Sequence, residues 1–315
     1  MMKAIVCTQY GSPKNLMMKE VAKPTPKSDE VLIRIQATSV TASDVLIRSM
    51  NQPLMLKVVL QMIFGFGKPR NPILGMVTAG TVEGVGKDVT RFQPGDEVVA
   101  YGSVSPTKRR FGSYAEYISL PEDWHLALKP SNLSHEEAAA IPYGGLLAKS
   151  LLSRATVTPG SEVLIYGASG SIGTMLIQLA KEAGATVTSV CSTRNFELVM
   201  SLGSDKVIDY TREEAEEQLE TYDVVFDAVG NSKSSPLKET SKSALTAGGK
   251  YISIDQGIPQ TPKDAFIHLQ KLAEQGKLTP VIDRTYPLSQ MAEAHEYVEL
   301  GHKKGNVVVT VSPQA

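Results

Sequence analysis

Three glycines of this 315-residue chain, Gly167, Gly170 and Gly173, have a spacing that suits the binding of a pyrophosphate. They follow a short apolar segment at residues 163–166 and precede a helical pattern over residues 171–183. Because glycine has no side chain, the backbone of such a turn can approach phosphate oxygens, and the first N–H groups of the helix point at them. A turn with a purely structural role is the alternative. We predict that a dinucleotide contacts Gly167, Ala168, Ser169, Gly170, Ser171, Ile172 and Gly173.

The next expected strand, residues 185–190, bears on which dinucleotide would bind. In NAD-binding versions of this arrangement an acid ends the second strand and accepts hydrogen bonds from the ribose. Residues 191–195 contain no acid and supply Ser192, Thr193 and Arg194 instead. Hydroxyl groups and a guanidinium suit a 2′-phosphate, so we predict NADPH rather than NADH. An ordinary solvated arginine is the alternative.

The elements that must position these residues follow from the pattern after residue 134, where helices and strands alternate. Such alternation predicts a parallel, doubly wound sheet of the α/β class. A capping box at residues 134–137 begins this region. The expected strands are residues 162–166, 185–190, 206–208, 223–227 and 249–254, and the expected helices are residues 171–183, 195–202, 212–219, 234–246 and 265–275.

The flanking regions have a different pattern. Short β segments with turns are expected at residues 30–36, 78–85 and 97–101, and residues 124–130 are expected to be a connector. A β pattern returns past residue 276. We therefore predict a β-rich domain of residues 1–124 and 277–315, divided by a nucleotide-binding domain of residues 125–276.

Composition excludes several classes of protein. The 32 Lys and Arg residues nearly balance the 33 Asp and Glu residues, which predicts neither a nucleic-acid partner nor an anionic membrane. Cys7 and Cys191 are the only cysteines, too few for a disulfide framework or a Cys-rich metal site. Residues 1–8 predict a strand rather than a signal peptide, and the apolar run at residues 54–66 is too short to cross a bilayer. We expect a cytoplasmic protein.

Several motifs together resemble those of the medium-chain dehydrogenase/reductase superfamily, in its zinc-independent quinone oxidoreductase (zeta-crystallin-like) branch. The resemblance implies a Rossmann domain inserted in a GroES-like β-rich catalytic domain, NADPH as the cofactor and a homodimer as the usual assembly. The motifs cover nearly the whole chain, at residues 75–86, 92–98, 112–117, 137–143, 167–173, 207–210, 227–230, 248–250 and 301–306.

The resemblance also implies cofactor contacts outside the glycine turn. Tyr210 matches a tyrosine near the adenosine 2′-phosphate, and Asn195 or Arg194 falls where relatives often have a phosphate-binding lysine. The remaining implied contacts are Val229 beside the cofactor ribose, Ser253 and Ile254 near the nicotinamide, and Asn306 in the last motif.

Zinc-binding relatives have ligands that this chain lacks. They carry a Cys near the position of Thr41 or Ala42, a Gly-His-Glu where this chain has residues 75–77, and a four-Cys lobe in the region of residues 101–110. Methionine, present here as Met76, is a soft and weak substitute for histidine. We predict no metal site. Hydride transfer from NADPH to a quinone or an α,β-unsaturated carbonyl needs no Lewis acid, and it is the predicted reaction.

Candidate catalytic residues are few. Thr41 stands where relatives have a substrate-contacting Asn, and its hydroxyl could bond a carbonyl or serve a buried turn. Tyr101 and Tyr143 could donate a proton, with packing as the alternative. Leu147 replaces a threonine of relatives and removes one nicotinamide contact. Two rivals therefore stay open: an NADP(H)-binding redox sensor or structural protein without turnover, and a zinc-type alcohol dehydrogenase-like enzyme.

The apolar, Met-rich segment of residues 54–66 has two interpretations. Apolar residues at helical spacing most often pack in a core. Because Pro53, Gly65 and Gly67 flank the segment and Met adapts to varied shapes, it could instead be a lid over an apolar substrate.

Overall fold

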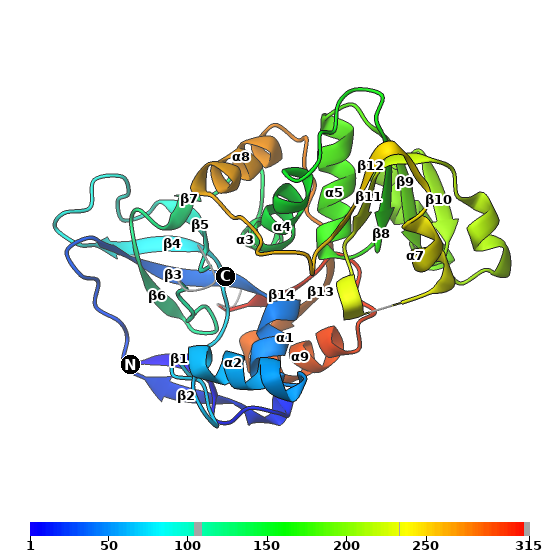
Figure 1. Cartoon of the computed structure of the whole chain (residues 1–315). Coiled ribbons are helices and arrows are strands. Elements are labelled where there is room, and N and C mark those ends of the chain that lie inside the picture. Colours follow the sequence, from blue (N-terminus) through cyan, green and yellow to red (C-terminus); the bar gives the residue numbers. More distant parts are fainter. Residues whose placement is uncertain (104–108, 233, 312–315) are drawn as a thin grey trace. The chain divides into compact units, whose positions relative to one another are not determined.

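The computed structural model describes residues 1–103, 109–232 and 234–311, with the backbone alone at Ser232. Packing divides the chain into two units (Figure 1): unit 1 is Met1–Pro142 with Ile282–Ala315, and unit 2 is Tyr143–Val281. The predicted domain limits at 124/125 and 276/277 stay a prediction. Residues 104–108, part of the region where zinc-binding relatives carry a four-Cys lobe, lie outside the described residues.

The described elements are as follows. The strands are β1 (Met2–Cys7), β2 (Leu16–Val21), β3 (Glu30–Val40), β4 (Val77–Val85), β5 (Glu97–Tyr101), β6 (Tyr117–Pro121), β7 (His125–Leu128), β8 (Glu162–Tyr166), β9 (Thr186–Cys191), β10 (Lys206–Asp209), β11 (Tyr222–Asp227), β12 (Leu245–Ser253), β13 (Ile282–Pro287) and β14 (Asn306–Thr310). The α-helices are α1 (Ala42–Ser49), α2 (Leu54–Phe64), α3 (His135–Ala139), α4 (Pro142–Leu152), α5 (Ser171–Glu182), α6 (Phe196–Ser201), α7 (Pro236–Ser241), α8 (Lys263–Glu274) and α9 (Met291–Glu299). The short 3-10 helices are Pro13–Asn15, Thr193–Asn195, Glu213–Gln218, Gly230–Ser232 and Leu288–Gln290.

Unit 1 is built on a mostly antiparallel sheet in the order β13-β14-β3-β4-β5-β7, with β6 also paired to β3. Strands β1 and β2 form a separate antiparallel pair. The expected connector at residues 124–130 is wrong, because His125–Leu128 form β7 and pair with β5. Pairing with a strand more than twenty residues away in the sequence stabilises this four-residue element, and no local pattern announces it.

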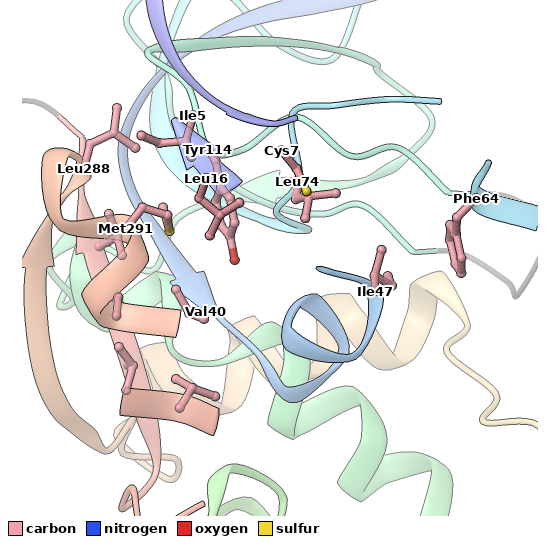
Figure 2. Packing of buried hydrophobic residues seen from close by; sticks show 14 of the residues in the cluster. Ile5, Cys7, Leu16, Val40, Ile47, Phe64, Leu74, Tyr114, Leu288 and Met291 are labelled. Atoms are coloured by element: carbon pink, nitrogen blue, oxygen red, sulfur yellow. The ribbon is translucent and has the colours of Figure 1, made fainter. Parts of the chain in front are cut away.

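The core of unit 1 joins segments from both ends of the chain (Figure 2). Tyr114 lies at its centre and is fully buried, and α9 packs against α1 and β14. Labelled members of the cluster in Figure 2 are Ile5, Cys7, Leu16, Val40, Ile47, Phe64, Leu74, Tyr114, Leu288 and Met291.

Unit 2 is built on a fully parallel sheet in the order β10-β9-β8-β11-β12 (Figure 1). Unit 2 therefore begins with β8 in the middle of the sheet, adds β9 and β10 toward one edge, and then adds β11 and β12 on the other side of β8, as in Rossmann folds. Strand β8 is almost entirely buried and α5 packs against β8 and β9. The predicted doubly wound α/β sheet is confirmed.

Two expected elements of unit 2 have different limits. The expected helix at residues 234–246 ends at Ser241, because Leu245 already pairs with Tyr222 in the sheet. The expected acidic helix at residues 212–219 is a 3-10 helix, Glu213–Gln218.

The apolar segment at residues 54–66 is helical but does not form a core. In α2 only Phe64 is buried, while most of its other apolar side chains are exposed. Core packing is therefore wrong for most of this segment, and a role as a lid stays a prediction.

The capping box at the start of α3 gives a test of how the fold is stabilised. The Ser134 Oγ accepts a hydrogen bond from the Glu137 N–H at 3.1 Å, and the Ser134 N–H donates to Glu137 Oε2 at 2.8 Å. Replacing Ser134 with alanine leaves a helix N–H without its acceptor, so we expect the free energy of unfolding to fall by about 1 kcal/mol. Urea unfolding measures the loss. The exposed Ser28→Ala control should change stability by less than about 0.5 kcal/mol, and an equal loss in both variants would contradict this role of the cap.

Candidate functional site

The glycine turn at the carboxyl end of β8 is a tightly packed backbone passage of unit 2. Gly167 has φ +80°, and a Cβ there would lie 2.4 Å from Val229 Cγ1. A Cβ at Gly173 would lie 2.3 Å from the carbonyl oxygen of Gly167, so α5 packs directly on the turn. At Gly170 the nearest atom to a Cβ is the Gly167 carbonyl oxygen at 3.5 Å. The outer glycines thus serve packing, whereas the middle one leaves room beside the backbone.

Helix α5 begins at this turn without a side-chain cap. Its N-cap residue is Gly170, no side chain accepts from its first N–H groups as a cap, and its first turn contains no acid. The partial positive charge of a helix N-terminus is therefore available to an anion here. A phosphate group between the turn and α5 fits this arrangement.

Asn195 connects the turn to the loop that follows β9. Its side-chain N–H group donates to Ser169 Oγ at 3.0 Å and to Ser192 Oγ at 3.4 Å. Its carbonyl oxygen Oδ1 is buried and has no hydrogen-bond partner among the described residues. A buried acceptor without a donor is unusual, and a hydroxyl of a bound molecule would satisfy it.

Asp209, which ends β10 and bonds this loop, has both carboxylate oxygens occupied. The N–H of Thr193 donates to Oδ2 at 3.0 Å, and the Thr193 hydroxyl donates to the same oxygen. The N–H and hydroxyl of Thr211 donate to Oδ1 at 2.9 and 2.7 Å. Burial raises the pKa of Asp209, but these hydrogen bonds outweigh it and hold the pKa below its usual value. Asp209 therefore shapes the loop as a carboxylate and has little capacity left for a ribose hydroxyl.

One arginine lies beside this carboxylate, and a second follows Thr193 in the sequence. The exposed Arg194 follows Thr193 directly, and Arg212 Nε lies 3.7 Å from Asp209 Oδ2 with its side chain 61% exposed. The ring of Tyr210 is 6.3 Å from that of Tyr166 between their centroids. The sequence prediction included Arg194 and Tyr210 but missed Arg212, although its place three residues after a strand-ending Asp could have indicated it.

A second carboxylate, Asp227, anchors the loop after β11. Its Oδ1 accepts the N–H groups of Val229 and Gly230 at 3.1 and 3.0 Å. Its Oδ2 accepts the hydroxyls of Tyr251 and Ser253 at 2.9 and 3.0 Å. The predicted residues Val229 and Ser253 are therefore brought together through Asp227, and the N–H of Ile254 donates to the Asp227 backbone carbonyl at 3.0 Å.

The charge of Asp227 is balanced inside the protein. Lys238 Nζ, 2.9 Å from Asp227 Oδ2, belongs to a side chain that is 6% exposed. Burial raises the pKa of Asp227, but the hydrogen bonds from Lys238 and Val229 outweigh it and lower the pKa overall. The sequence prediction missed the roles of Asp227 and Lys238. The one signal for Asp227 was its position as an acid at the end of an apolar strand.

Tyr143, one of the candidate proton donors, lies near the start of α4 in unit 2 and is buried. A Cβ at its neighbour Gly144 would lie 2.3 Å from the carbonyl oxygen of Ser171, so α4 and α5 approach closely. Leu147, on the same helix, is also buried. Tyr143 therefore directly precedes the residue of α4, Gly144, that packs against Ser171 at the start of α5.

The other predicted residues lie in unit 1. Thr41 is the N-cap of α1, where its hydroxyl donates to Asp44 Oδ2 at 2.6 Å and its N–H donates to the same oxygen at 2.9 Å. Burial raises the pKa of Asp44 to about 6, against the opposing effect of these hydrogen bonds. Tyr101 is buried in β5, and Asn306 is the buried first residue of β14. Within the described residues, no group of three or more His, Cys, Asp or Glu side chains is arranged to hold a metal ion.

Known proteins resemble this chain in sequence and structure. Residues 27–131 match the family described as "Alcohol dehydrogenase GroES-like domain", and residues 202–266 and 257–309 match "Zinc-binding dehydrogenase". A chloroplastic NADPH-dependent alkenal/one oxidoreductase of Arabidopsis thaliana is 33% identical over 99% of this chain and 80% of its own. A 2-methylene-furan-3-one reductase of Solanum lycopersicum is 35% identical over the same shares of the two chains.

The fold is also that of a solved enzyme. The structure of the quinone oxidoreductase from Coxiella burnetii matches with a TM-score of 0.83 and 28% identity, over 99% of each chain. These similarities confirm the predicted combination of a GroES-like and a Rossmann-like fold. The chain therefore belongs to the medium-chain dehydrogenase/reductase superfamily of NAD(P)H-dependent oxidoreductases, in its quinone oxidoreductase-like branch.

Proposed function

We propose that the protein reduces quinones or α,β-unsaturated carbonyls with NADPH and without a metal ion. The observation that carries the proposal is the N-terminus of α5 at the glycine turn, which has no side-chain cap and lies beside a loop whose bonded acid, Asp209, has both oxygens occupied by hydrogen bonds. The substrate class is supported by the relatives, two of which are named for an alkenal/one and for a 2-methylene-furan-3-one.

The residues of unit 2 fit a dinucleotide along the carboxyl ends of β8, β9 and β11. The N–H groups at the start of α5 would hold the pyrophosphate, in the space left beside Gly170. Asn195 Oδ1 would accept a hydrogen bond from a ribose hydroxyl. At the other end Val229, Ser253 and Ile254 would border the nicotinamide ribose, held in place by Asp227.

The preference for NADPH over NADH rests on charge. An exposed acid at the adenosine ribose would repel a 2′-phosphate and accept hydroxyls instead. Asp209, the acid found here, is occupied by Thr193 and Thr211. Arg212 lies beside it, and Arg194 adds a second positive charge to the loop after β9. Guanidinium groups bind phosphate oxygens through charge-assisted hydrogen bonds, so this loop favours the phosphorylated cofactor.

The chemistry itself needs little from the protein. When bound, the nicotinamide supplies a hydride to an electron-poor carbon of the acceptor. The chain orients the reactants and excludes water, and a side-chain hydroxyl delivers a proton to the reduced acceptor. Tyr101, Tyr143 and Thr41 are the proposed hydroxyls. The hydroxyl proton of Thr41 is already donated to Asp44.

A zinc-free reaction follows from the donor set. At the two positions where zinc-binding relatives carry Cys and His, this chain has Thr41, which bonds Asp44, and Met76, which is buried. Neither side chain is a strong zinc ligand. An acceptor that is already activated by conjugation does not require a metal ion to polarise it.

We also propose a cytoplasmic location and a homodimer. Cys7 and Cys191 are buried free thiols, and burial raises the pKa of Cys7 to about 11 and that of Cys191 to about 12. Such thiols suit a reducing compartment, in which disulfides are rare. The homodimer rests on the family resemblance alone.

Turnover distinguishes this function from its rivals. We expect NADPH to be oxidised on mixing with 1,4-quinones, 2-alkenals or 2-alkenones, and no reduction of NADP⁺ with primary alcohols. Absorbance of the reduced cofactor measures both reactions. Dialysis against a chelator should leave the rate unchanged, since no metal takes part. NADPH binding without turnover on any acceptor would instead support a sensor or structural protein, and a chelator-sensitive alcohol reaction would support a zinc enzyme.

The choice of cofactor can be tested at the two arginines. We expect Arg194→Ala and Arg212→Ala each to weaken NADPH binding about tenfold, which is the loss of one charge-assisted hydrogen bond. NADH binding should change less than about twofold in both variants, because NADH lacks the 2′-phosphate. Fluorescence titration of the two cofactors gives the dissociation constants, and the exposed Arg34→Ala in unit 1 is the matched control. Equal losses for NADPH and NADH would refute the proposed 2′-phosphate site.

A further inference from the structure

Helix α2 has its polar and apolar faces in an unusual arrangement. Its partly or fully buried stripe consists of Lys57, Leu60, Gln61 and Phe64, at the spacing of one helix face. Both polar residues of the helix therefore lie on the side that the protein partly covers. The outward side is wholly apolar, with exposures between 36% and 78% at Leu54, Met55, Leu56, Val58, Val59, Met62 and Ile63.

The rest of unit 1 holds α2 in this orientation. Phe64 belongs to the core cluster (Figure 2), and its ring lies 5.9 Å from that of Phe111 between centroids. The Tyr10 hydroxyl donates to the Gly65 carbonyl at 3.1 Å, and the Arg70 N–H donates to the Phe64 carbonyl at 2.7 Å. Because these contacts fix the end of the helix, the outward apolar face is a built feature of unit 1.

An apolar face of this size is costly in water and is usually covered by a partner. The charges around it indicate which partner. No Asp or Glu occurs between Asp44 and Glu83, a stretch that contains Arg48, Lys57, Lys68 and Arg70. Arg48 is buried and paired with Glu299, but Lys68 and Arg70 are exposed directly after the helix. This stretch of the chain is therefore apolar and cationic, although the total charge of the chain is nearly neutral.

We infer that α2 docks unit 1 onto an anionic lipid surface. The helix would lie in the plane of the interface, with its apolar side among the acyl chains and Lys57, Lys68 and Arg70 near the headgroups. A second copy of the same face is a poorer occupant, because a two-fold contact would bring the same uncompensated cations together. Among the described residues, no helix is long and apolar enough to cross a bilayer, so the contact is peripheral.

This docking is independent of the proposed reaction, and its test uses no activity. The full-length protein is sedimented with phosphatidylcholine vesicles and with vesicles that also contain phosphatidylglycerol. We expect binding to the anionic vesicles alone, falling as salt is added. Lys68→Glu and Arg70→Glu should each weaken binding at least about fivefold, and Lys87→Glu, at an exposed lysine after β4, should leave it unchanged.

The contribution of the apolar side of α2 to vesicle binding is tested by one double variant and one control variant. Val59→Gln together with Met62→Gln should weaken binding to anionic vesicles at least about tenfold, since both side chains would leave the acyl region. Met200→Gln, at a comparably exposed methionine on α6, is the control and should bind as wild type. Unchanged thermal unfolding shows that each variant is folded. No binding by the wild type, equal binding to both vesicle types, or dimerisation lost on changing Val59 and Met62 would overturn the inference.

Discussion

The carboxylate of Asp227 holds the carboxyl end of the parallel sheet together. Five donors from three different segments converge on its two oxygens: two backbone N–H groups of the following loop, two hydroxyls of β12 and the ammonium of Lys238 in α7. A buried charge is tolerated only where such partners compensate the loss of water. Removing Asp227 would release the loop, the end of β12 and α7 together, and with them the surface proposed for the nicotinamide.

Asp209 likewise fixes a loop through hydrogen bonds, on the other side of β8 in the sheet. Both acids end parallel strands and both are buried. The carboxylate oxygens of both accept hydrogen bonds from other groups of the protein. Their environments differ in how the negative charge is balanced. Asp227 has the buried Lys238, whereas Asp209 has the largely exposed Arg212. The charge of Asp227 is thus balanced inside the protein by Lys238. At Asp209 the balancing charge, that of Arg212, faces the solvent from which a cofactor arrives.

Local pattern predicted much of unit 2. The strand at residues 162–166 has its expected limits, because a continuous apolar run between turns is typical of a buried parallel strand. Strand β7 could not be predicted in this way, since its four residues depend on pairing with β5. The helical spacing of residues 54–66 indicated the helix that the structure has at Leu54–Phe64, but burial depends on neighbours that spacing does not identify. The same holds for the partners of Asp227, which are contributed by residues up to 26 positions away.

The division of unit 1 between two segments has a consequence for synthesis on the ribosome. All five strands of unit 2 lie between Glu162 and Ser253, so that sheet can form as soon as this stretch has emerged. Residues 37–40 of β3 must wait for β14, which pairs with them as Thr310 to Ala37 and Val307 to Val40. Until then this part of β3 has an open edge that could pair with another chain. The nascent protein is therefore most exposed to misassembly while its cofactor domain is already folding.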